Sequence, residues 1–413
     1  MLDRLSMCRS AATGLIALAL SGCSLDISNP NVIDASTIDP VEDARVFSLS
    51  AQQDFYSAYA GFINSSAYYS NETWSGAVRN ETNDIGRHVI VDTNIDLNGT
   101  FWAPLQIAIG TNDRVVEVLR DSPTFGTEIA AARASAWSGF AITLLAEAFC
   151  EGVLHVGPAL TPVQMLDSAI VRFQQAITIA QAITGAEATK LLNAARVGIA
   201  RASLAKGDNA GALAAAALVP PAFVANTAQA DDPAPLVRAR TGNGVFLLAA
   251  GTTQIAAGAY RALNDPRVTS VDAGSNAQDG QNRLFRQTKY PNVTAPIRIA
   301  SGLEARYIAA EAELDQSGNT APALALIAER RTAGGQPAFG GTTAADVLAE
   351  LMNQRARDFW LEAKHLGDII RNPAAAALLP PPGSPFYKPQ LGNFEALTCL
   401  PVPFIERANN PNF

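Results

Sequence analysis

The segment from Thr161 to Ile183 constrains the fold most strongly, because its apolar residues recur at the spacing of an α-helix. Thr161 can cap this helix, Pro162 fits its first position, and Gln164 completes a capping box. The apolar face consists of Leu166, Ala169, Ile170, Phe173, Ala176, Ile177, Ala180 and Ile183. An amphipathic helix of this kind must bury its apolar face against a neighbouring element.

The neighbouring segments repeat this pattern and predict more helices, separated by short Gly-Asp or Gly-Asn turns. The expected helices are Glu128–Phe149, Ala188–Lys206, Ala210–Leu218, Leu303–Gln316, Ala321–Arg331 and one long helix over Leu348–Arg371. Their small residues and antiparallel pairing are similar to degenerate tetratricopeptide units, although the periods are irregular. We expect helix pairs at about 101–218 and 301–371, an irregular insert at about 219–300 and an extended tail at 372–413.

The N-terminus indicates export. Arg4 and Arg9 precede the apolar stretch Ala11–Leu20, which is shorter than the roughly 20 residues that a membrane-spanning helix needs. The sequence Leu20-Ser21-Gly22-Cys23 resembles the lipobox of bacterial lipoproteins, which implies a signal peptide over 1–22 and lipidation of Cys23. In the alternative, the signal peptide is an ordinary one and Cys23 is incidental. Ser24 favours the outer membrane over the inner membrane.

Charge and composition exclude several classes of protein. The chain of 413 residues is 48% hydrophobic, which is enough for a large core and too apolar for disorder. Its net charge of -8 becomes one unit more negative when Arg4, Arg9 and Asp3 leave with the signal peptide. We therefore expect no nucleic-acid partner.

Two cysteines remain after export and acylation, Cys150 and Cys399. In an oxidising compartment they can form one long-range disulfide. Each can also be a small buried hydrophobic residue. Neither interpretation makes them catalytic.

Four segments, in the same order along nearly the whole mature chain, resemble the SusD/RagB family of nutrient-binding outer-membrane lipoproteins. They are Leu25–Asn31 with its Asn29-Pro30-Asn31, Arg306–Ala312 with its Ala-Glu-Ala, Arg355–Arg371, and the ending Leu400–Pro403 with Asn409–Asn412. The resemblance implies a mainly all-α fold, a SusD-like right-handed superhelix of degenerate tetratricopeptide helix pairs with irregular loops and minor β structure. It also implies a single domain over 23–413. Ala363 and Leu366 depart from the family pattern, and the chain is shorter than typical members.

The residues that enzymes use for catalysis do not form a recognisable motif. The only histidines are His88, His155 and His365, and no zinc, phosphate-loop or Cys-x-x-Cys motif is present. We expect no catalytic residue, no metal and no cofactor. A glycosidase hypothesis rests only on the carboxylates near the aromatic residues, which are Asp54, Glu72, Glu81 and Asp84.

A mixture of aromatic and polar residues between positions 68 and 84 is typical of a ligand-binding surface, because aromatic rings stack on sugars or peptide side chains. The candidate ligand-binding residues are Tyr68, Tyr69, Asn71, Trp74, Arg79 and Asn80, with Trp74 the best single candidate. In the alternative, Tyr68 and Tyr69 end a core helix that starts near Asp54. Trp102, Trp137 and Trp360 fit core packing, with the last two inside helices. The alternating charges Glu304, Arg306, Glu311, Arg330, Arg331 and Arg355 fit structural ion pairs.

Three functions follow. The first is a surface-exposed, lipid-anchored outer-membrane protein that captures an oligosaccharide or peptide for a SusC-like TonB-dependent transporter. The second is a tetratricopeptide scaffold lipoprotein that faces the periplasm. The third is a surface glycan hydrolase.

Overall fold

The computed structural model describes residues 39–413, and helices dominate this part of the chain. The signal peptide, Cys23 and the Asn29-Pro30-Asn31 phrase lie outside the described residues. Residues Ala44–Phe413 form one compact unit. The expectation of a mainly α-helical fold is confirmed.

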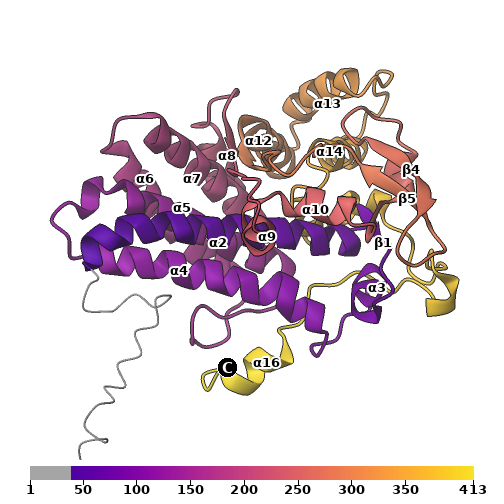
Figure 1. Ribbon diagram of the computed structural model, residues 1–413. Helices are drawn as coiled ribbons and strands as arrows, with labels where there is room; N and C mark the ends of the chain where they lie inside the picture. The colour runs from indigo at the N-terminus through magenta and orange to yellow at the C-terminus, as the bar shows by residue number, and fades with distance from the viewer. Residues whose placement is uncertain (1–38) are drawn as a thin grey trace, which may run out of the picture. The chain divides into compact units, whose positions relative to one another are not determined.

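The longest helix is α2 (Pro40–Tyr69), which crosses the centre of the view in Figure 1. Asp39 caps its start, because its Oδ1 accepts hydrogen bonds from the backbone N–H groups of Val41 and Glu42, each at 2.9 Å. Proline at the first helical position removes an N–H group that would have no partner there. The interpretation in which Tyr68 and Tyr69 end a core helix is confirmed, although this helix begins well before Asp54.

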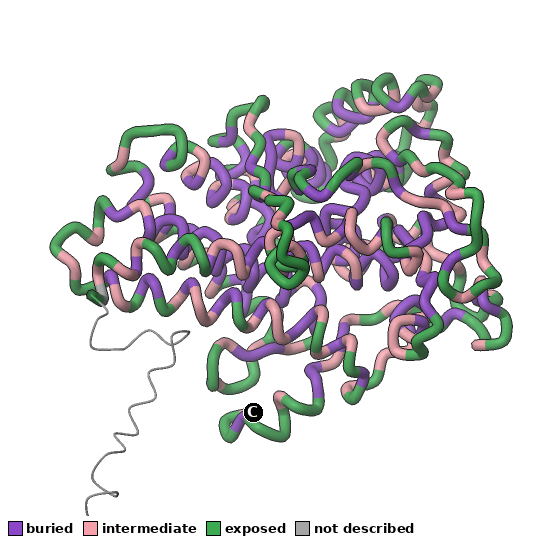
Figure 2. Tube along the Cα trace, in the orientation of Figure 1, coloured by how far each residue is buried: buried purple, intermediate pink, exposed green. Residues whose placement is uncertain are grey.

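A first group of helices packs around α5, whose residues are nearly all buried (Figures 1 and 2). The group consists of α4 (Ala103–Leu119), α5 (Ile129–Ala148), α6 (Pro162–Gln181), α7 (Ala186–Ala205) and α8 (Asn209–Ala216). Trp137 of α5 stacks on Phe55 of α2, with ring centroids 5.4 Å apart. Among the described helices, α5 alone is long and apolar enough to cross a membrane, but 94% of its apolar stretch is buried in the protein. It is therefore a core helix.

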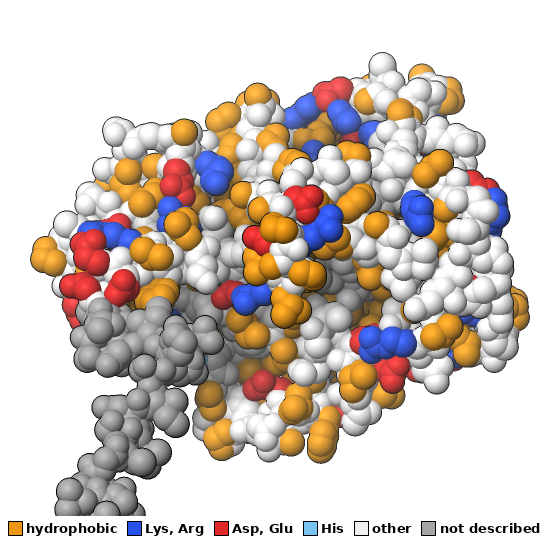
Figure 3. Space-filling view, viewed as in Figure 1, with side chains coloured by type: hydrophobic (Ala, Val, Ile, Leu, Met, Phe, Trp, Pro, Cys, Tyr) orange, Lys and Arg blue, Asp and Glu red, His pale blue; other side chains and the backbone are white. Residues whose placement is uncertain are grey.

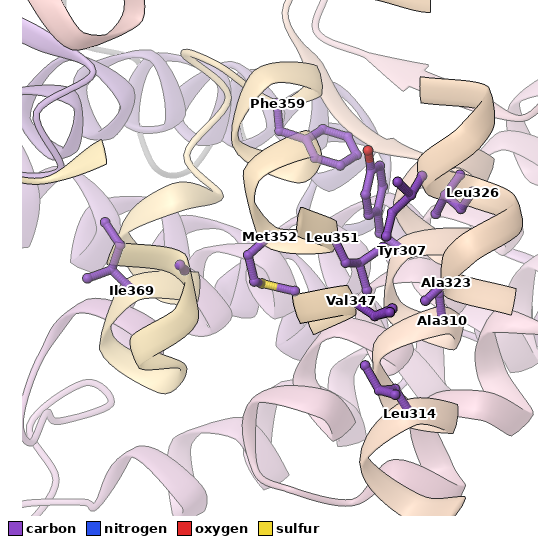
Figure 4. Close-up of a cluster of buried hydrophobic side chains, with 12 residues drawn as sticks. Tyr307, Ala310, Leu314, Ala323, Leu326, Val347, Leu351, Met352, Phe359 and Ile369 are labelled. Carbon is purple, nitrogen blue, oxygen red and sulfur yellow. The ribbon is translucent and has the colours of Figure 1, made fainter. Parts of the chain in front are cut away.

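A second group, α12 to α15, shares the hydrophobic cluster in Figure 4. Its helices are α12 (Gly302–Ser317), α13 (Ala321–Ala333), α14 (Ala344–Asp358) and α15 (His365–Arg371). Tyr307 of α12, Leu326 of α13 and Leu351 of α14 meet in the middle of this cluster. Helix α12 also contacts α7 and α8, so the two groups form a continuous helical body.

The expectation of one long helix over Leu348–Arg371 is wrong. Helix α14 ends at Asp358, and a turn separates it from α15. Leu361 and Ala363 have φ angles of 57° and 55°, which an α-helix cannot contain. Trp360 therefore lies in this turn rather than in a helix, although it is fully buried, as are Trp102 and Trp137.

The segment between the two helix groups contains short helices and contributes strands to three antiparallel two-stranded sheets. Its elements are β2 (Val224–Asn226), α9 (Pro235–Thr241), α10 (Gly244–Ala250), β3 (Gln254–Ala256), α11 (Gly258–Arg261), β4 (Ser270–Asn276), β5 (Arg283–Gln287) and β6 (Arg298–Ser301). Strand β2 pairs with β6, and β4 pairs with β5. Strand β3 pairs with β1 (Thr73–Ser75), which follows α2 directly. After β1 come α3 (Asn80–Gly86) and a π-helical segment, Leu97–Trp102.

The C-terminal tail lies over the helices with little regular structure. It contains two 3₁₀ turns, Pro373–Leu378 and Pro389–Leu391, and the short helix α16 (Phe404–Asn409). A disulfide joins Cys399 in the tail to Cys150 at the end of α5, with Cα atoms 5.0 Å apart. The closing Asn-Pro-Asn phrase also holds the tail, because Asn410 and Asn412 donate hydrogen bonds to backbone carbonyls of the α5–α6 connection.

The charged residues of the helix contacts form structural ion pairs, as expected. Arg355 donates to Asp368 at 2.6 Å, and the buried pair of Lys364 and Glu304 has N and O atoms 3.2 Å apart. The other pairs are Arg306–Glu329, Arg330–Asp358, Arg331–Glu350 and Arg371–Glu311. On the face shown in Figure 3, basic and acidic side chains lie in small mixed groups.

Candidate functional site

Strand β1 places Trp74 at the centre of the candidate site. In the β1–β3 ladder, Trp74 lies opposite Ile255, and its neighbours Thr73 and Ser75 are buried. Side chains alternate along a strand, so Thr73 and Ser75 point to the opposite side of the strand from Trp74. The half-buried indole packs on its own side of β1 against the small apolar cluster of Ile255, Ala277 and Leu284.

The indole of Trp74 stacks on the ring of Tyr387 from the C-terminal tail. The ring centroids are 4.6 Å apart and the planes differ by 10°. The Tyr387 hydroxyl accepts a hydrogen bond from the Ser75 N–H at 2.5 Å and donates one to the Ser75 carbonyl at 3.0 Å. These two bonds fix the tyrosine ring over the strand, and with it the position of the stacked pair.

Asn71 contacts the indole of Trp74 at its ring nitrogen. Its Oδ1 accepts a hydrogen bond from Trp74 Nε1 at 2.8 Å, and its Nδ2 donates one to the Leu378 carbonyl at 3.1 Å. Asn71 has a φ of 56°, a left-handed conformation that asparagine tolerates better than most residues. It therefore connects the Trp74 ring to the tail segment that forms the wall of the site.

The stacked pair borders a cavity of about 370 Å³. Its lining is formed by Asn71, Trp74, Ala259, Ala377, Leu378, Leu379, Pro380, Pro385, Tyr387 and Phe394. Of the described residues, no Asp, Glu, Lys or Arg lines this cavity. Its walls are apolar and aromatic, and Asn71 and Tyr387 supply the polar side-chain groups. A surface of this kind binds by stacking and van der Waals contact rather than by charge.

A buried carboxyl group lies behind the site. The side chain of Glu72 accepts hydrogen bonds from the Leu361 N–H at 2.8 Å and from the Ser70 hydroxyl at 2.9 Å, while its carbonyl accepts one from Trp360 Nε1 at 3.2 Å. Burial raises the pKa of Glu72 to about 7. Glu72 thus joins β1 to the turn that separates α14 from α15.

The remaining predicted site residues do not join Trp74 and Asn71. Tyr68 and Arg79 border a different cavity of about 350 Å³, where Arg79 pairs with Asp96 at 2.6 Å. Tyr69 is 1% exposed and exchanges hydrogen bonds with the backbone of Thr398, so a ligand cannot reach it in this conformation. Asn80 is an exposed residue that begins α3. The six residues therefore lie in separate environments, and only Asn71 and Trp74 share a cavity.

Sequence reasoning missed the tail residues of the site. Tyr387 and Phe394 belong to a Pro-rich segment that carries no local pattern typical of a binding site. The adjacent aromatic residues Phe386 and Tyr387 were the only signal there, and nothing in the sequence relates them to Trp74.

The histidines do not assemble a catalytic group in the part of the chain that the structure describes. His155 pairs with Asp113 at 3.0 Å, but Arg172 and Ser138 hold the same carboxylate, so this aspartate is saturated by structural partners. His365 is buried, and burial lowers its pKa to about 4. Over residues 39–413, no group of three or more His, Cys, Asp and Glu side chains could hold a metal ion.

Several solved structures are similar to this chain. A laminarin-binding SusD-like protein is 15% identical with a TM-score of 0.68, covering 90% of this chain and 98% of its own. Surface glycan-binding protein A from Bacteroides thetaiotaomicron, in complex with laminarihexaose, is 15% identical with a TM-score of 0.67 and the same coverage. A SusD superfamily protein from Parabacteroides distasonis is 13% identical with a TM-score of 0.67, covering 91% of this chain and 98% of its own.

No protein-family model and no curated protein matches the sequence. At identities this low, the similarity to solved structures establishes the fold. The resemblance to the SusD/RagB family is confirmed at this level: the chain has the SusD-like fold.

Proposed function

We propose that this protein is a glycan-binding lipoprotein of the outer membrane that captures an oligosaccharide and delivers it to a SusC-like TonB-dependent transporter. In this function the protein binds the oligosaccharide and does not cleave it. The observation that carries it is the stacked pair of Trp74 and Tyr387 on an uncharged cavity.

The chemistry of this cavity supports a sugar ligand. The faces of sugar rings are apolar enough to pack on aromatic rings, while their hydroxyl groups need only a few polar partners at the rim. One of the similar structures is described as a laminarin-binding protein, and another is a surface glycan-binding protein in complex with laminarihexaose. A peptide ligand is the alternative outcome of a binding test.

Replacing Trp74 tests the binding site. We expect Trp74→Ala to weaken oligosaccharide affinity by about 2 kcal/mol, or roughly 30-fold, because a central aromatic anchor carries much of the energy of such a contact. Calorimetric titration with laminarihexaose and with a panel of other oligosaccharides measures the change. Phe404→Ala is the matched control, since this aromatic residue is 56% exposed on α16 and does not line the cavity.

An unchanged affinity in the Trp74 variant would move the site elsewhere, and the cavity bordered by Tyr68 and Arg79 would be the next candidate. Binding of peptides and of no oligosaccharide would contradict the proposed ligand class.

The lipid anchor and the transporter are tested in cells. Cys23→Ala should abolish labelling by a radioactive fatty acid, because the acceptor thiol is lost. A surface-exposed protein should be degraded by protease added to intact cells, whereas a periplasmic scaffold should survive. Purification of the native lipoprotein should also recover a SusC-like barrel, and its absence would favour the scaffold.

A further inference from the structure

The side chains of Trp74 and Arg261 both approach the backbone of Gly258. Helix α11 begins at Gly258 and ends at Arg261. A Cβ atom on Gly258 would lie 2.9 Å from Trp74 Cη2 and 3.7 Å from Arg261 Nη2. The absence of a side chain at Gly258 therefore lets the indole and the guanidinium approach the same point of the backbone.

The guanidinium of Arg261 is held in place without using its terminal nitrogens. Its Nε donates a hydrogen bond to the Ala256 carbonyl at 3.0 Å, and its Cζ lies 3.8 Å from the ring centroid of Phe285. A cation over an aromatic face is stabilised electrostatically, so strands β3 and β5 fix the orientation of the group. The two Nη atoms remain as donors.

Within residues 39–413, Arg261 has no carboxylate at ion-pair distance. Asp272, whose charge acts on it, is paired with Arg283 at 2.8 Å. By contrast, the nearby Arg267 binds both Asp265 and Asp358. Partial burial of Arg261 lowers its pKa, as expected for a cation that loses water without gaining an anion. Such donors are stabilised when a ligand supplies oxygen atoms.

Helix α11 contributes to two hollows. Its residue Ala259 lines the aromatic cavity. Arg261, two residues further on, borders a hollow of about 360 Å³ whose polar lining includes Asn264, Thr269 and Ser270, together with Asp265, which is paired with Arg267 and Arg357. A chain of linked sugars could occupy the first hollow and continue into the second, whereas a single sugar could not contact both.

We propose that Arg261 is a specificity-determining residue, whose Nη atoms donate hydrogen bonds to an oligosaccharide that runs from the Trp74 cavity past Gly258. This inference rests on the proposed function and deepens it. The forked guanidinium matches a pair of acceptor oxygens, which neighbouring hydroxyls of a neutral sugar or the carboxylate of a uronic acid can provide.

The test compares Arg261→Gln and Arg261→Lys in the full mature chain, titrated with laminarihexaose and with hexagalacturonate. Arg114→Gln is the matched control, because Arg114 is 68% exposed on α4 and lies outside both hollows. For whichever oligosaccharide binds the wild type, we expect about a tenfold loss with glutamine, a smaller loss with lysine and no loss in the control. A loss with hexagalacturonate assigns the carboxylate as acceptor, and a loss with laminarihexaose assigns the hydroxyls.

The inference is overturned if Arg261→Gln and Arg261→Lys both keep wild-type affinity while Trp74→Ala loses it. Failure of the proposed function gives a different result, since the wild type would then bind neither of these two oligosaccharides nor any member of the panel, and both proposals would fall. Thermal unfolding of each variant confirms that it is folded, and the lysine variant retains the charge over Phe285 if the glutamine variant is unstable.

Discussion

Glu72 is the residue that couples the candidate site to the protein interior. Its carboxyl group is buried and hydrogen-bonded to the Leu361 N–H, and burial raises its pKa from 4.5 to about 7. Between these pH values the folded protein holds a proton that the unfolded chain has released. The contribution of Glu72 to stability is therefore fully present below about pH 4.5 and is lost as the pH rises through about 7.

Substituting Glu72 by glutamine should remove this dependence, because the amide keeps an acceptor for Leu361 and does not ionise. We expect the free energy of unfolding of the wild type, relative to Glu72→Gln, to fall by about 3 kcal/mol between pH 4.5 and pH 7.5. Urea denaturation across this range measures it. Glu117→Gln, at an exposed residue of α4, serves as the control. Identical pH profiles for the wild type and Glu72→Gln would contradict the prediction.

His365 makes this comparison between variants necessary. Burial lowers its pKa from 6.5 to about 4, so its contribution is present above pH 6.5 and is lost as the pH falls through about 4. The two groups therefore oppose each other between pH 4.5 and pH 6.5. In a pH profile of the wild type alone, the contributions of Glu72 and His365 to stability would partly cancel. The difference between the wild type and Glu72→Gln isolates the contribution of Glu72.

At the level of helices, local sequence signals predicted an element correctly where the tertiary packing agrees with them. The capping box of Thr161 and Gln164 occurs as expected at the start of α6. The turn after Asp358 could not be predicted, because residues far away in the sequence hold it. The Glu72 carboxyl group accepts a hydrogen bond from the N–H of the left-handed Leu361, and Arg201 donates one to the carbonyl of the left-handed Ala363. The early start of α2 was missed because apolar residues of its first turns, such as Val46 and Leu49, are exposed and break the periodicity.

Close packing of α5, α6 and α7 depends on glycine at Gly198. A Cβ atom there would lie 2.4 Å from Cζ of Phe173, and one on Gly139 would lie 2.7 Å from Cε1 of the same ring. We expect Gly198→Ala to destabilise the protein by about 1 to 3 kcal/mol, although alanine favours a helix by about 1 kcal/mol. Chemical denaturation measures the change, and Phe173→Leu in the same chain should restore part of it.

Gly110→Ala is the matched control, because a Cβ atom there meets nothing within 4 Å. This helical substitution should stabilise the protein by up to about 1 kcal/mol. A Gly198→Ala variant as stable as the control would mean that Phe173 moves away without cost.

Across the whole chain, the candidate site is assembled from segments far apart in the sequence. Trp74 follows α2, Ala259 belongs to α11, and Tyr387 comes from the tail. Sequence patterns indicated Trp74 as a candidate and left the pairing of the two cysteines open, but the contact between Trp74 and Tyr387 depends on the path of the tail. That path is set by tertiary contacts such as the Tyr387 hydroxyl on Ser75 and the buried Lys388 ammonium on the Ala77 carbonyl.

Because Tyr387 is held by its own hydrogen bonds to Ser75, a change that destabilises the tail should leave ligand affinity nearly unchanged. The disulfide between Cys150 and Cys399 closes a loop of 249 residues, so Cys150→Ser with Cys399→Ser should lower the free energy of unfolding by roughly 3 kcal/mol. Tyr387 remains bonded to Ser75, so oligosaccharide affinity below the unfolding temperature should stay within about twofold of the wild type. Trp74→Ala should show the reverse, a large loss of affinity with a smaller loss of stability. Denaturation and titration of both variants measure this, and an equal loss of affinity in the two would mean that the disulfide itself positions Tyr387.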